Sequence, residues 1–510
     1  MSTQQPPAAA STPQAPAPRP APVEGRRAQE AAGPSPVREG SRVVILGGGP
    51  GGYEAALVAA QLGARATVVE RQGIGGSAVL TDVVPSKTLI ATAEWMTIAD
   101  SAAELGITAD GGTDGEVGGL RVDLRVVNER VVELAARQSR DIHARLEREG
   151  IEVIDGEGRL DGGLGSDGTR HVLVRTADGG ERRLTADVTL VATGAVPRVL
   201  PDAQPDGERI LTWAQMYSLT ALPDHLVVVG SGVTGAEFAG AYNALGVPVT
   251  LVSSRDRVLP GEDEDAAELI ESVFRSRGMT VLSRSRAAAV RRTGDVVEVE
   301  LEDGRVVEAS HCLVAVGGVP STAGLGLEEA GVAVADSGHI QVDRVSRTTA
   351  LRIYAAGDCT GVLPLASVAA MQGRIAMWHA LGDAVAPLDR SAVAANIFTA
   401  PEIATIGVTQ ADVEEGRVDG TVTRLPLGRN PRAKMLGIRE GFVKVIADTS
   451  SGVVIGGVVV APRASELIFP LAVAVTQRLT VDQLANVFTI YPSLSGSIAE
   501  AARTLHLREQ

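Results

Sequence analysis

A short apolar run followed by a glycine-rich turn and a helical stretch occurs twice along this chain. In the first copy, the apolar run 42–46 leads into the spacing G-x-G-x-x-G at 47–52. In the second copy, the apolar run 226–229 leads into the same spacing at 230–235. A short continuous apolar run bounded by glycine is typical of a parallel strand that is buried on both faces. Each copy therefore predicts a strand–turn–helix unit of an α/β fold.

The glycine spacing predicts that each unit binds a dinucleotide. The first glycine allows a tight turn, the second lets the backbone approach a pyrophosphate, and the third lets the helix pack on the strand. The glycines in these positions are Gly47, Gly49 and Gly52 in the first copy, and Gly230, Gly232 and Gly235 in the second. Two dinucleotides in one chain indicate electron transfer between them.

The two copies differ where the next apolar run ends. Glu70 ends this run in the first copy, and an anionic, bidentate acceptor suits the two hydroxyls of a ribose. Ser253 holds the matching place in the second copy and is followed by Ser254, Arg255 and Arg257. These hydroxyl and guanidinium groups suit a 2′-phosphate, and no carboxylate here repels a bare ribose. The alternative interpretation is that the two arginines belong to an ordinary charged turn with no role in binding. We predict that the second unit takes NADPH and NADH, with NADPH favoured.

The rest of the pattern predicts further elements. We expect a loop at 108–119, a helix at 122–148 and strands at 151–154, 171–174 and 188–191. A third pattern begins near residue 394 and mixes strands such as 452–460 with helices such as 465–478. Residues 1–40 are rich in Pro and Ala and contain almost no large apolar side chains, which predicts a disordered tail.

Composition narrows the class of protein. The 510 residues are 45% hydrophobic and 21% charged, as in ordinary α/β proteins, and the length allows several domains. The net charge of -15 argues against a nucleic-acid surface, and no apolar run is long enough to span a bilayer. Cys312 and Cys359 are the only cysteines, and they predict two buried thiols in a reducing cytoplasm, without a disulfide framework or a metal site.

Four motifs together resemble those of the flavoprotein pyridine nucleotide–disulfide oxidoreductases. They are the glycine turn at 47–52, Ala192-Thr193-Gly194, Ile353-Tyr354-Ala355-Ala356-Gly357-Asp358 and Thr399-Ala400-Pro401-Glu402. The resemblance implies an α/β fold with two Rossmann-like dinucleotide-binding domains, for FAD and NAD(P)H, and a C-terminal α+β dimerisation domain that makes a homodimer. The implied limits are 41–200 with 322–393 for the FAD domain, 201–321 for the NAD(P)H domain and 394–510 for the dimerisation domain.

The resemblance also implies which residues bind the cofactors. For FAD they are Gly47, Gly49, Gly52, Glu70, Gly76, Lys87, Gly158, Thr193, Gly194, Asp358 and Ala366. For NAD(P)H they are Gly230, Gly232, Gly235, Glu237, Ser254, Arg255, Arg257 and Gly317. Lys87 and Glu237 would form an ion pair beside the flavin and the nicotinamide, where a cation stabilises reduced flavin. Ala366 would open a helix that points at the flavin.

Two departures from the family's pattern concern its redox disulfide. The family has Gly-Gly-Thr-Cys-(x4)-Cys-Ile-Pro-Ser-Lys, whereas this chain, from Gly75 to Lys87, has Ala78 and Val83 at the cysteine positions. The family's C-terminal His-Pro-Thr-(x2)-Glu reads Tyr491-Pro492-Ser493-Leu494-Ser495-Gly496 here, so its acid–base pair is missing as well. Thiol–disulfide exchange needs a thiolate, and this segment offers none.

A reduced flavin without a disulfide must pass its electrons directly to a diffusible acceptor. We predict an FAD-dependent NAD(P)H:quinone oxidoreductase, as in the branch of the family that has an altered redox segment. Ala78 and Val83 would give the emptied face an apolar character that suits a flat quinone. Tyr491, contributed by the partner subunit, would stack on the quinone or donate a hydrogen bond, with a packing role as the alternative. A pyridine nucleotide transhydrogenase and a non-catalytic binding subunit are the competing hypotheses.

Overall fold

The computed structural model describes residues 40–100, 102, 106–107 and 120–506. The tail predicted at 1–40, except for Gly40, and the loop predicted at 108–119 lie outside these residues. The described strands form a seven-stranded sheet, two five-stranded sheets, a three-stranded sheet and a two-stranded ribbon. None of the described helices is both long enough and apolar enough to cross a membrane.

The seven-stranded sheet has the strand order β17-β6-β1-β2-β3-β4-β5. Its strands are β1 (Arg42–Leu46), β2 (Arg65–Glu70), β3 (Glu152–Leu160), β4 (Arg170–Thr176), β5 (Glu181–Ala186), β6 (Val188–Val191) and β17 (Ile353–Ala355). The five from β17 to β3 run parallel, and β4 and β5 continue antiparallel. In β1, Val43 and Ile45 join one apolar cluster while Val44 and Leu46 join another, so this strand is buried on both faces as predicted.

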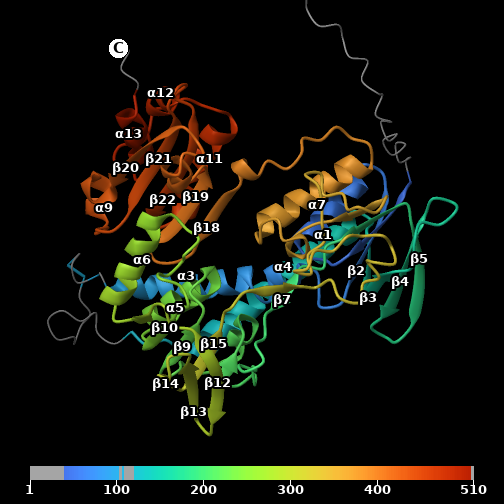
Figure 1. Ribbon diagram of the computed structural model, residues 1–510, viewed down its shortest axis with the longest axis horizontal. Helices are drawn as coiled ribbons and strands as arrows, with labels where there is room; N and C mark the ends of the chain where they lie inside the picture. The colour runs from blue at the N-terminus through green and yellow to red at the C-terminus, as the bar shows by residue number, and fades with distance from the viewer. Residues whose placement is uncertain (1–39, 101, 103–105, 108–119, 507–510) are drawn as a thin grey trace, which may run out of the picture. The chain divides into compact units, whose positions relative to one another are not determined.

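Helices α1 (Pro50–Gln61) and α7 (Ala366–Ala380) pack against each other beside this sheet (Figure 1). A Cβ atom at Gly373 of α7 would overlap the carbonyl oxygen of Gly51 in α1, so the two helix backbones touch. Three further helices belong to this part of the chain: α2 (Gly76–Leu80), α3 (Val83–Asp100) and α4 (Leu124–Arg148). Helix α4 confirms the helix predicted at 122–148, and it begins where the Asp123 carboxylate accepts a hydrogen bond from the N–H of Val126.

The second large sheet is parallel, with the order β11-β10-β9-β15-β8. Its strands are β8 (Ile210–Leu211), β9 (Leu226–Val229), β10 (Val249–Val252), β11 (Thr280–Leu282) and β15 (His311–Val314). The helices of this part are α5 (Val233–Ala244), α6 (Glu264–Ser276) and the 3₁₀ helix η2 (Trp213–Ser218). The antiparallel strands β12 (Ala287–Thr293), β13 (Val296–Leu301) and β14 (Val306–Ala309) cover the face to which Val227 and Val229 point. A ribbon of β7 (Ala195–Pro197) and β16 (Gly318–Pro320) connects the two large sheets.

The C-terminal sheet is antiparallel, with the order β18-β19-β22-β21-β20. Its strands are β18 (Ala394–Ile397), β19 (Glu402–Gly407), β20 (Gly420–Pro426), β21 (Phe442–Asp448) and β22 (Val454–Ala461). Its helices are α8 (Gln410–Glu414), α9 (Pro431–Met435), α10 (Ala464–Leu467), α11 (Phe469–Thr476), α12 (Val481–Ala485) and α13 (Gly496–Thr504). The single helix predicted at 465–478 is wrong, because Pro470 has no N–H to donate to Glu466 and the helix restarts as α11.

The other predicted strands are present with adjusted ends. The strand predicted at 188–191 is β6. The strand predicted at 151–154 overlaps the start of the longer β3, and the one predicted at 171–174 lies within β4. The strand predicted at 452–460 is β22. The described chain is therefore α/β, with two Rossmann-like domains followed by an α+β domain.

Candidate functional site

The first glycine turn connects β1 to α1. Gly47 has a φ of +101°, which a side chain would strain, and a Cβ there would overlap the carbonyl oxygen of Ala192. A Cβ at Gly52 would overlap the carbonyl oxygen of Gly47, so the helix rests directly on the turn. Gly49 faces open space and caps α1 without a side chain. The turn therefore exposes backbone N–H groups and the helix N-terminus to a ligand.

The second glycine turn, between β9 and α5, repeats this geometry. Gly230 has a φ of +111°, and a Cβ there would overlap the carbonyl oxygen of Ala315. A Cβ at Gly235 would overlap the carbonyl oxygen of Gly230, while Gly232 again faces open space. Because each glycine meets the same constraint in both turns, the two turns have the same capacity to hold a pyrophosphate.

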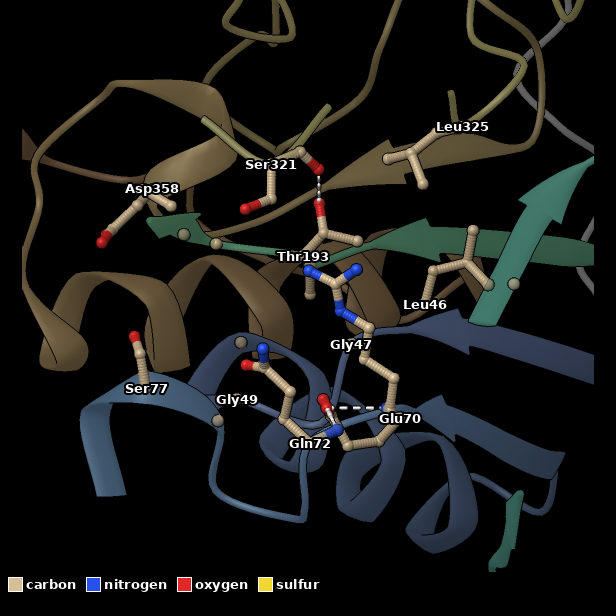
Figure 2. A pocket seen from close by; sticks show the side chains of 18 of the residues that line it. Leu46, Gly47, Gly49, Glu70, Gln72, Ser77, Thr193, Ser321, Leu325 and Asp358 are labelled. Atoms are coloured by element: carbon tan, nitrogen blue, oxygen red, sulfur yellow. Dashed lines mark hydrogen bonds between the residues drawn. The ribbon is translucent and has the colours of Figure 1, made fainter. Parts of the chain in front are cut away.

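A cavity of about 850 Å³ lies against the first turn (Figure 2). The predicted FAD residues that line it are Gly47, Gly49, Glu70, Gly76, Gly158, Thr193, Gly194, Asp358 and Ala366. In Figure 2, Ser77 and Asp358 lie at the left of the view, and Glu70 and Leu46 lie at the right. The other two predicted FAD residues, Gly52 and Lys87, do not line the cavity. Gly52 packs directly against the backbone of Gly47, and Lys87 forms an ion pair with Glu237 of α5. A long cavity of this size, bounded by a glycine turn and an acid, fits FAD.

Glu70 ends β2 and holds the turn while it faces the cavity. Its Oε2 accepts from the N–H of Gly48 at 2.6 Å, and its Oε1 accepts from the N–H groups of Arg71 and Gln72 at 2.8 and 2.7 Å. These bonds fix the carboxylate beside the turn, fill both acceptor positions of Oε1 and leave one free on Oε2. Glu70 is thus positioned to accept a further hydrogen bond from a ribose hydroxyl through Oε2, and it has a structural role that the sequence did not reveal.

The far wall of the cavity comes from segments distant in the sequence. The Thr193 hydroxyl donates to the carbonyl of Ser321 at 2.7 Å, which ties the end of β6 to the chain after β16 (Figure 2). Asp358 begins the 3₁₀ helix η3 (Asp358–Thr360), and burial raises the pKa of its carboxyl group. Helix α7 begins at Ala366, where its N-terminal N–H groups face the same cavity.

Lys87 and Glu237 form an ion pair between α3 and α5. The Lys87 Nζ lies 2.8 Å from Oε2 of Glu237, and Oε1 of Glu237 accepts from the N–H of Phe398 at 2.8 Å. The Glu237 side chain is 3% exposed and that of Lys87 is 26% exposed. Lys87 also lies over the Phe398 ring, 5.0 Å from its centroid. The pair implied by the resemblance is therefore present, and it joins elements of all three domains.

Helix α2 and the start of α3 present apolar side chains at the positions where the family has cysteine. Ala78 and Val83 both line the cavity. Cys312 and Cys359 are fully buried, and burial raises the pKa of the Cys312 thiol to about 12 and that of Cys359 to about 11. Neither cysteine lines the cavity, so no thiolate is available there at neutral pH.

One functional candidate in this segment escaped the sequence analysis. Asp82 lies between Ala78 and Val83 on the cavity wall, and burial raises the pKa of its carboxyl group to about 6, against the opposing effect of Lys87. A carboxylate inside the altered redox segment was the available signal. Its burial depends on elements far away in the sequence, so the pattern alone offered no reason to select it.

The loop after β10 contains the groups predicted to choose the nicotinamide cofactor. Ser253 is fully buried, and its hydroxyl bonds to that of Ser231 at 2.7 Å, which joins this loop to the glycine turn. Ser254 and Arg255 are exposed, and the Arg255 side chain makes no ion pair with any described residue. Arg257 forms an ion pair in which its Nη1 lies 2.5 Å from Oε1 of Glu264. Gly317 follows β15 at the same edge of the sheet.

Tyr491 does not line the cavity of its own chain. It belongs to the loop between α12 and α13, where Val487, Phe488, Ile490 and Tyr491 are all exposed, Tyr491 by 82%. An exposed apolar cluster of this kind is typical of a surface that a second protein chain covers.

Comparison with known proteins decides the family. Residues 41–373 match the family model of the pyridine nucleotide-disulphide oxidoreductases, and residues 393–502 match the dimerisation domain of that family. The chain belongs to the pyridine nucleotide-disulphide oxidoreductase family. It is thus a flavoprotein oxidoreductase that uses FAD and NAD(P)H, and its fold is the predicted pair of dinucleotide-binding domains with a C-terminal dimerisation domain.

Three similar proteins illustrate the range of the family. A protein of Mycobacterium tuberculosis named NAD(P)H dehydrogenase (quinone) is 55% identical over 468 residues, which are 91% of this chain and 94% of that protein. The dihydrolipoyl dehydrogenase of Chlorobaculum tepidum is 33% identical over 464 residues, which are 90% and 96% of the two chains. The crystal structure of LpdA from Mycobacterium tuberculosis superposes with a TM-score of 0.86, at 55% identity, and covers 92% of this chain and all of that one.

Proposed function

We propose that this protein is an FAD-dependent NAD(P)H:quinone oxidoreductase. The observation that carries the proposal is the cavity wall at Ala78 and Val83, because it keeps the surroundings of a flavin but has no thiol to relay electrons. The two glycine turns and the Lys87–Glu237 pair favour an active oxidoreductase over a non-catalytic subunit. The name of the 55% identical protein from Mycobacterium tuberculosis supports the same acceptor class.

Each predicted residue has a defined task in this proposal. The turn at Gly47, Gly49 and Gly52 binds the pyrophosphate of FAD, and Glu70 accepts its ribose hydroxyls. FAD held by these residues would supply the redox chemistry between NAD(P)H and the quinone. Lys87 would act on the ring system of bound FAD through its ammonium group, and Glu237 holds that ammonium group at 2.8 Å. The residue ranges 41–200 with 322–393, 201–321 and 394–510 are the proposed limits of the three domains.

The second glycine turn and the loop after β10 bind NADPH and NADH, with NADPH favoured. Gly230, Gly232 and Gly235 hold the pyrophosphate, with Gly317 at the same edge of the sheet. Ser254, Arg255 and Arg257 face the adenosine ribose, and Arg255, which pairs with no described carboxylate, offers its charge to a 2′-phosphate. No carboxylate occupies the Ser253 position, so a bare ribose is not repelled.

Dimerisation completes the quinone site in this proposal. The exposed loop with Phe488 and Ile490 lies against the partner, and Tyr491 of the partner subunit contacts the quinone by stacking or by a hydrogen bond. The two buried, unpaired cysteines support a reducing, cytoplasmic environment for this dimer.

The test is a comparison of electron acceptors with the purified, yellow holoenzyme. NADPH oxidation is followed with menadione, lipoamide, glutathione disulfide or thio-NAD⁺ as acceptor. We expect rapid oxidation with menadione and background rates with the two disulfides. Turnover with thio-NAD⁺ alone would make the protein a transhydrogenase, which the proposed use of both nucleotides also permits. A colourless protein that binds no FAD would instead support the non-catalytic hypothesis.

A further inference from the structure

The Asp82 carboxyl group lies in the cavity wall at the place where the redox segment departs from the family. Its backbone is fixed on both sides, because its N–H donates to the carbonyl of Ser77 at 2.8 Å and its own carbonyl accepts from the N–H of Ser86 at 2.8 Å. Ala78 and Val83 line the same cavity. Asp82 therefore places an ionisable group between the two apolar side chains that stand at the family's cysteine positions.

Local structure does not explain this aspartate. Asp82 immediately precedes α3, a position where aspartate usually caps the helix. Asp123 and Asp263 do this elsewhere in the chain, since their carboxylates accept hydrogen bonds from the N–H groups of Val126 and Ala266. Within the described part of the chain, the Asp82 carboxylate accepts no hydrogen bond. Its oxygens remain available to a ligand in the cavity.

Charged and polar groups from four elements face Asp82. Lys87 of α3 attracts its negative charge, whereas Glu237 of α5 and Asp358 of η3 repel it, and the phenol of Tyr217 of η2 lies close enough to interact. Lys87 is already paired with Glu237 at 2.8 Å, so its charge is shared. Burial is the largest effect and raises the pKa of Asp82 to about 6. A carboxyl group in these surroundings exchanges its proton near neutral pH.

Quinone reduction requires a proton that hydride does not supply. NAD(P)H, one proton and a quinone give NAD(P)⁺ and a hydroquinone, so hydride provides both electrons and one of the two hydrogens. The family's histidine, which protonates a leaving thiol, is replaced by tyrosine here. If the protein reduces quinones as proposed above, another group near the acceptor must provide the second proton.

We infer that the Asp82 carboxyl group holds this second proton and delivers it to a quinone oxygen. The O–H bond of the Asp82 carboxylic acid breaks, an O–H bond of the hydroquinone forms, and the resulting carboxylate takes a new proton from water. The electrons come from NAD(P)H through the flavin, so no further reductant is needed.

The first test measures the proton on Asp82 without turnover. The infrared band of a protonated carboxylic acid is followed during a pH titration of the oxidised holoenzyme. The wild type should lose such a band with a midpoint near pH 6, and the band should be missing from Asp82→Asn but present in Asp123→Asn. A midpoint in the ordinary range of aspartate, or a band that persists in Asp82→Asn, would overturn the inference.

The second test separates the two half-reactions. Protein reduced with NADPH in the absence of oxygen is mixed with menadione at pH values on both sides of 6. The wild-type reoxidation rate should fall as pH rises through the pKa, and Asp82→Asn should be slower by about 100-fold and lose this pH dependence. Asp82→Glu should recover the pH dependence, Asp123→Asn should match the wild type, and reduction by NADPH should change in none of them.

The outcomes distinguish this inference from the proposed function. If menadione reoxidises Asp82→Asn as fast as the wild type, with the same pH profile, Asp82 is not the proton donor and the quinone reductase assignment stands. If menadione fails to reoxidise the wild type, the proposed function is wrong and the role of Asp82 fails with it.

Discussion

Replacing Lys87 by methionine tests the ion pair that lies between the two dinucleotide-binding domains. The change removes the positive charge and keeps the length of the side chain, so Glu237 remains buried with only the N–H of Phe398 to satisfy it. Removing one partner of a fully buried pair costs about 3–5 kcal/mol, and exposed pairs contribute about 0–1 kcal/mol. Glu237 is 3% exposed and Lys87 is 26% exposed, so we expect a loss of about 2–3 kcal/mol.

The assay is urea unfolding of the holoenzyme with excess FAD, combined with the rate of flavin reduction by NADPH. Glu237→Gln and the double variant complete a thermodynamic cycle, in which the double variant should lose at least about 1 kcal/mol less than the sum of the single variants. Arg125→Met is the control, because its pair with Glu129 is exposed to solvent and should contribute little to stability. The reasoning is refuted if Lys87→Met is no less stable than Arg125→Met and is reduced by NADPH at the wild-type rate.

Four other predictions concern the cofactor turns, the acceptor and pH. Arg255→Ala should lower kcat/KM for NADPH about 10-fold while sparing NADH, and an unchanged ratio between the cofactors would count against a 2′-phosphate site. Tyr491→Ala should raise KM for menadione, whereas Tyr491→Phe keeps the ring and removes only the hydroxyl, so comparing the two separates stacking from hydrogen bonding. If neither variant changes the kinetics, Tyr491 has only a packing role. Gly52→Ala should yield protein without flavin, whereas Gly235→Ala should stay yellow but resist reduction by NADPH; equal flavin content in both would contradict the assignment of the turns. The pKa of Asp82 is about 6 in the folded state, against an ordinary value of 3.8. Between pH 3.8 and 6 the folded state therefore binds more protons than the unfolded state, so the free energy of unfolding falls as the pH rises through 6. Asp82→Asn should remove this effect and gain up to about 3 kcal/mol at pH 8 but nothing at pH 3, which urea unfolding at both pH values would check.

The glycine turns were predictable from the sequence because their spacing encodes backbone geometry. A position that requires a positive φ, such as Gly47, or that touches another backbone, such as Gly52, admits no other residue without strain. The strands β1 and β9 were equally clear, because an uninterrupted apolar run leaves few alternatives to a buried strand. The split between α10 and α11 was missed because the apolar pattern continues through Pro470.

Properties that depend on distant neighbours were not predictable in the same way. The pattern indicated Arg257 as a phosphate ligand but did not reveal its bond to Glu264. It indicated Glu70 as a ribose ligand but did not reveal the three backbone N–H groups that this carboxylate accepts from, one of them in the turn. Asp82 was not recognisable from the sequence, because its burial and the charges around it come from the distant elements η2, α5 and η3. Such surroundings arise only when the chain folds.

Anaerobic stopped-flow measurement of flavin reoxidation tests the proposed quinone reductase activity most directly. The yellow protein is reduced with NADPH and then mixed separately with menadione, lipoamide, glutathione disulfide and NAD⁺. A cavity with Ala78 and Val83 in place of the cysteines predicts rapid reoxidation by menadione and none by the two disulfides. Rapid reoxidation by lipoamide or glutathione disulfide, or by NAD⁺ alone, would contradict the assignment as a quinone reductase.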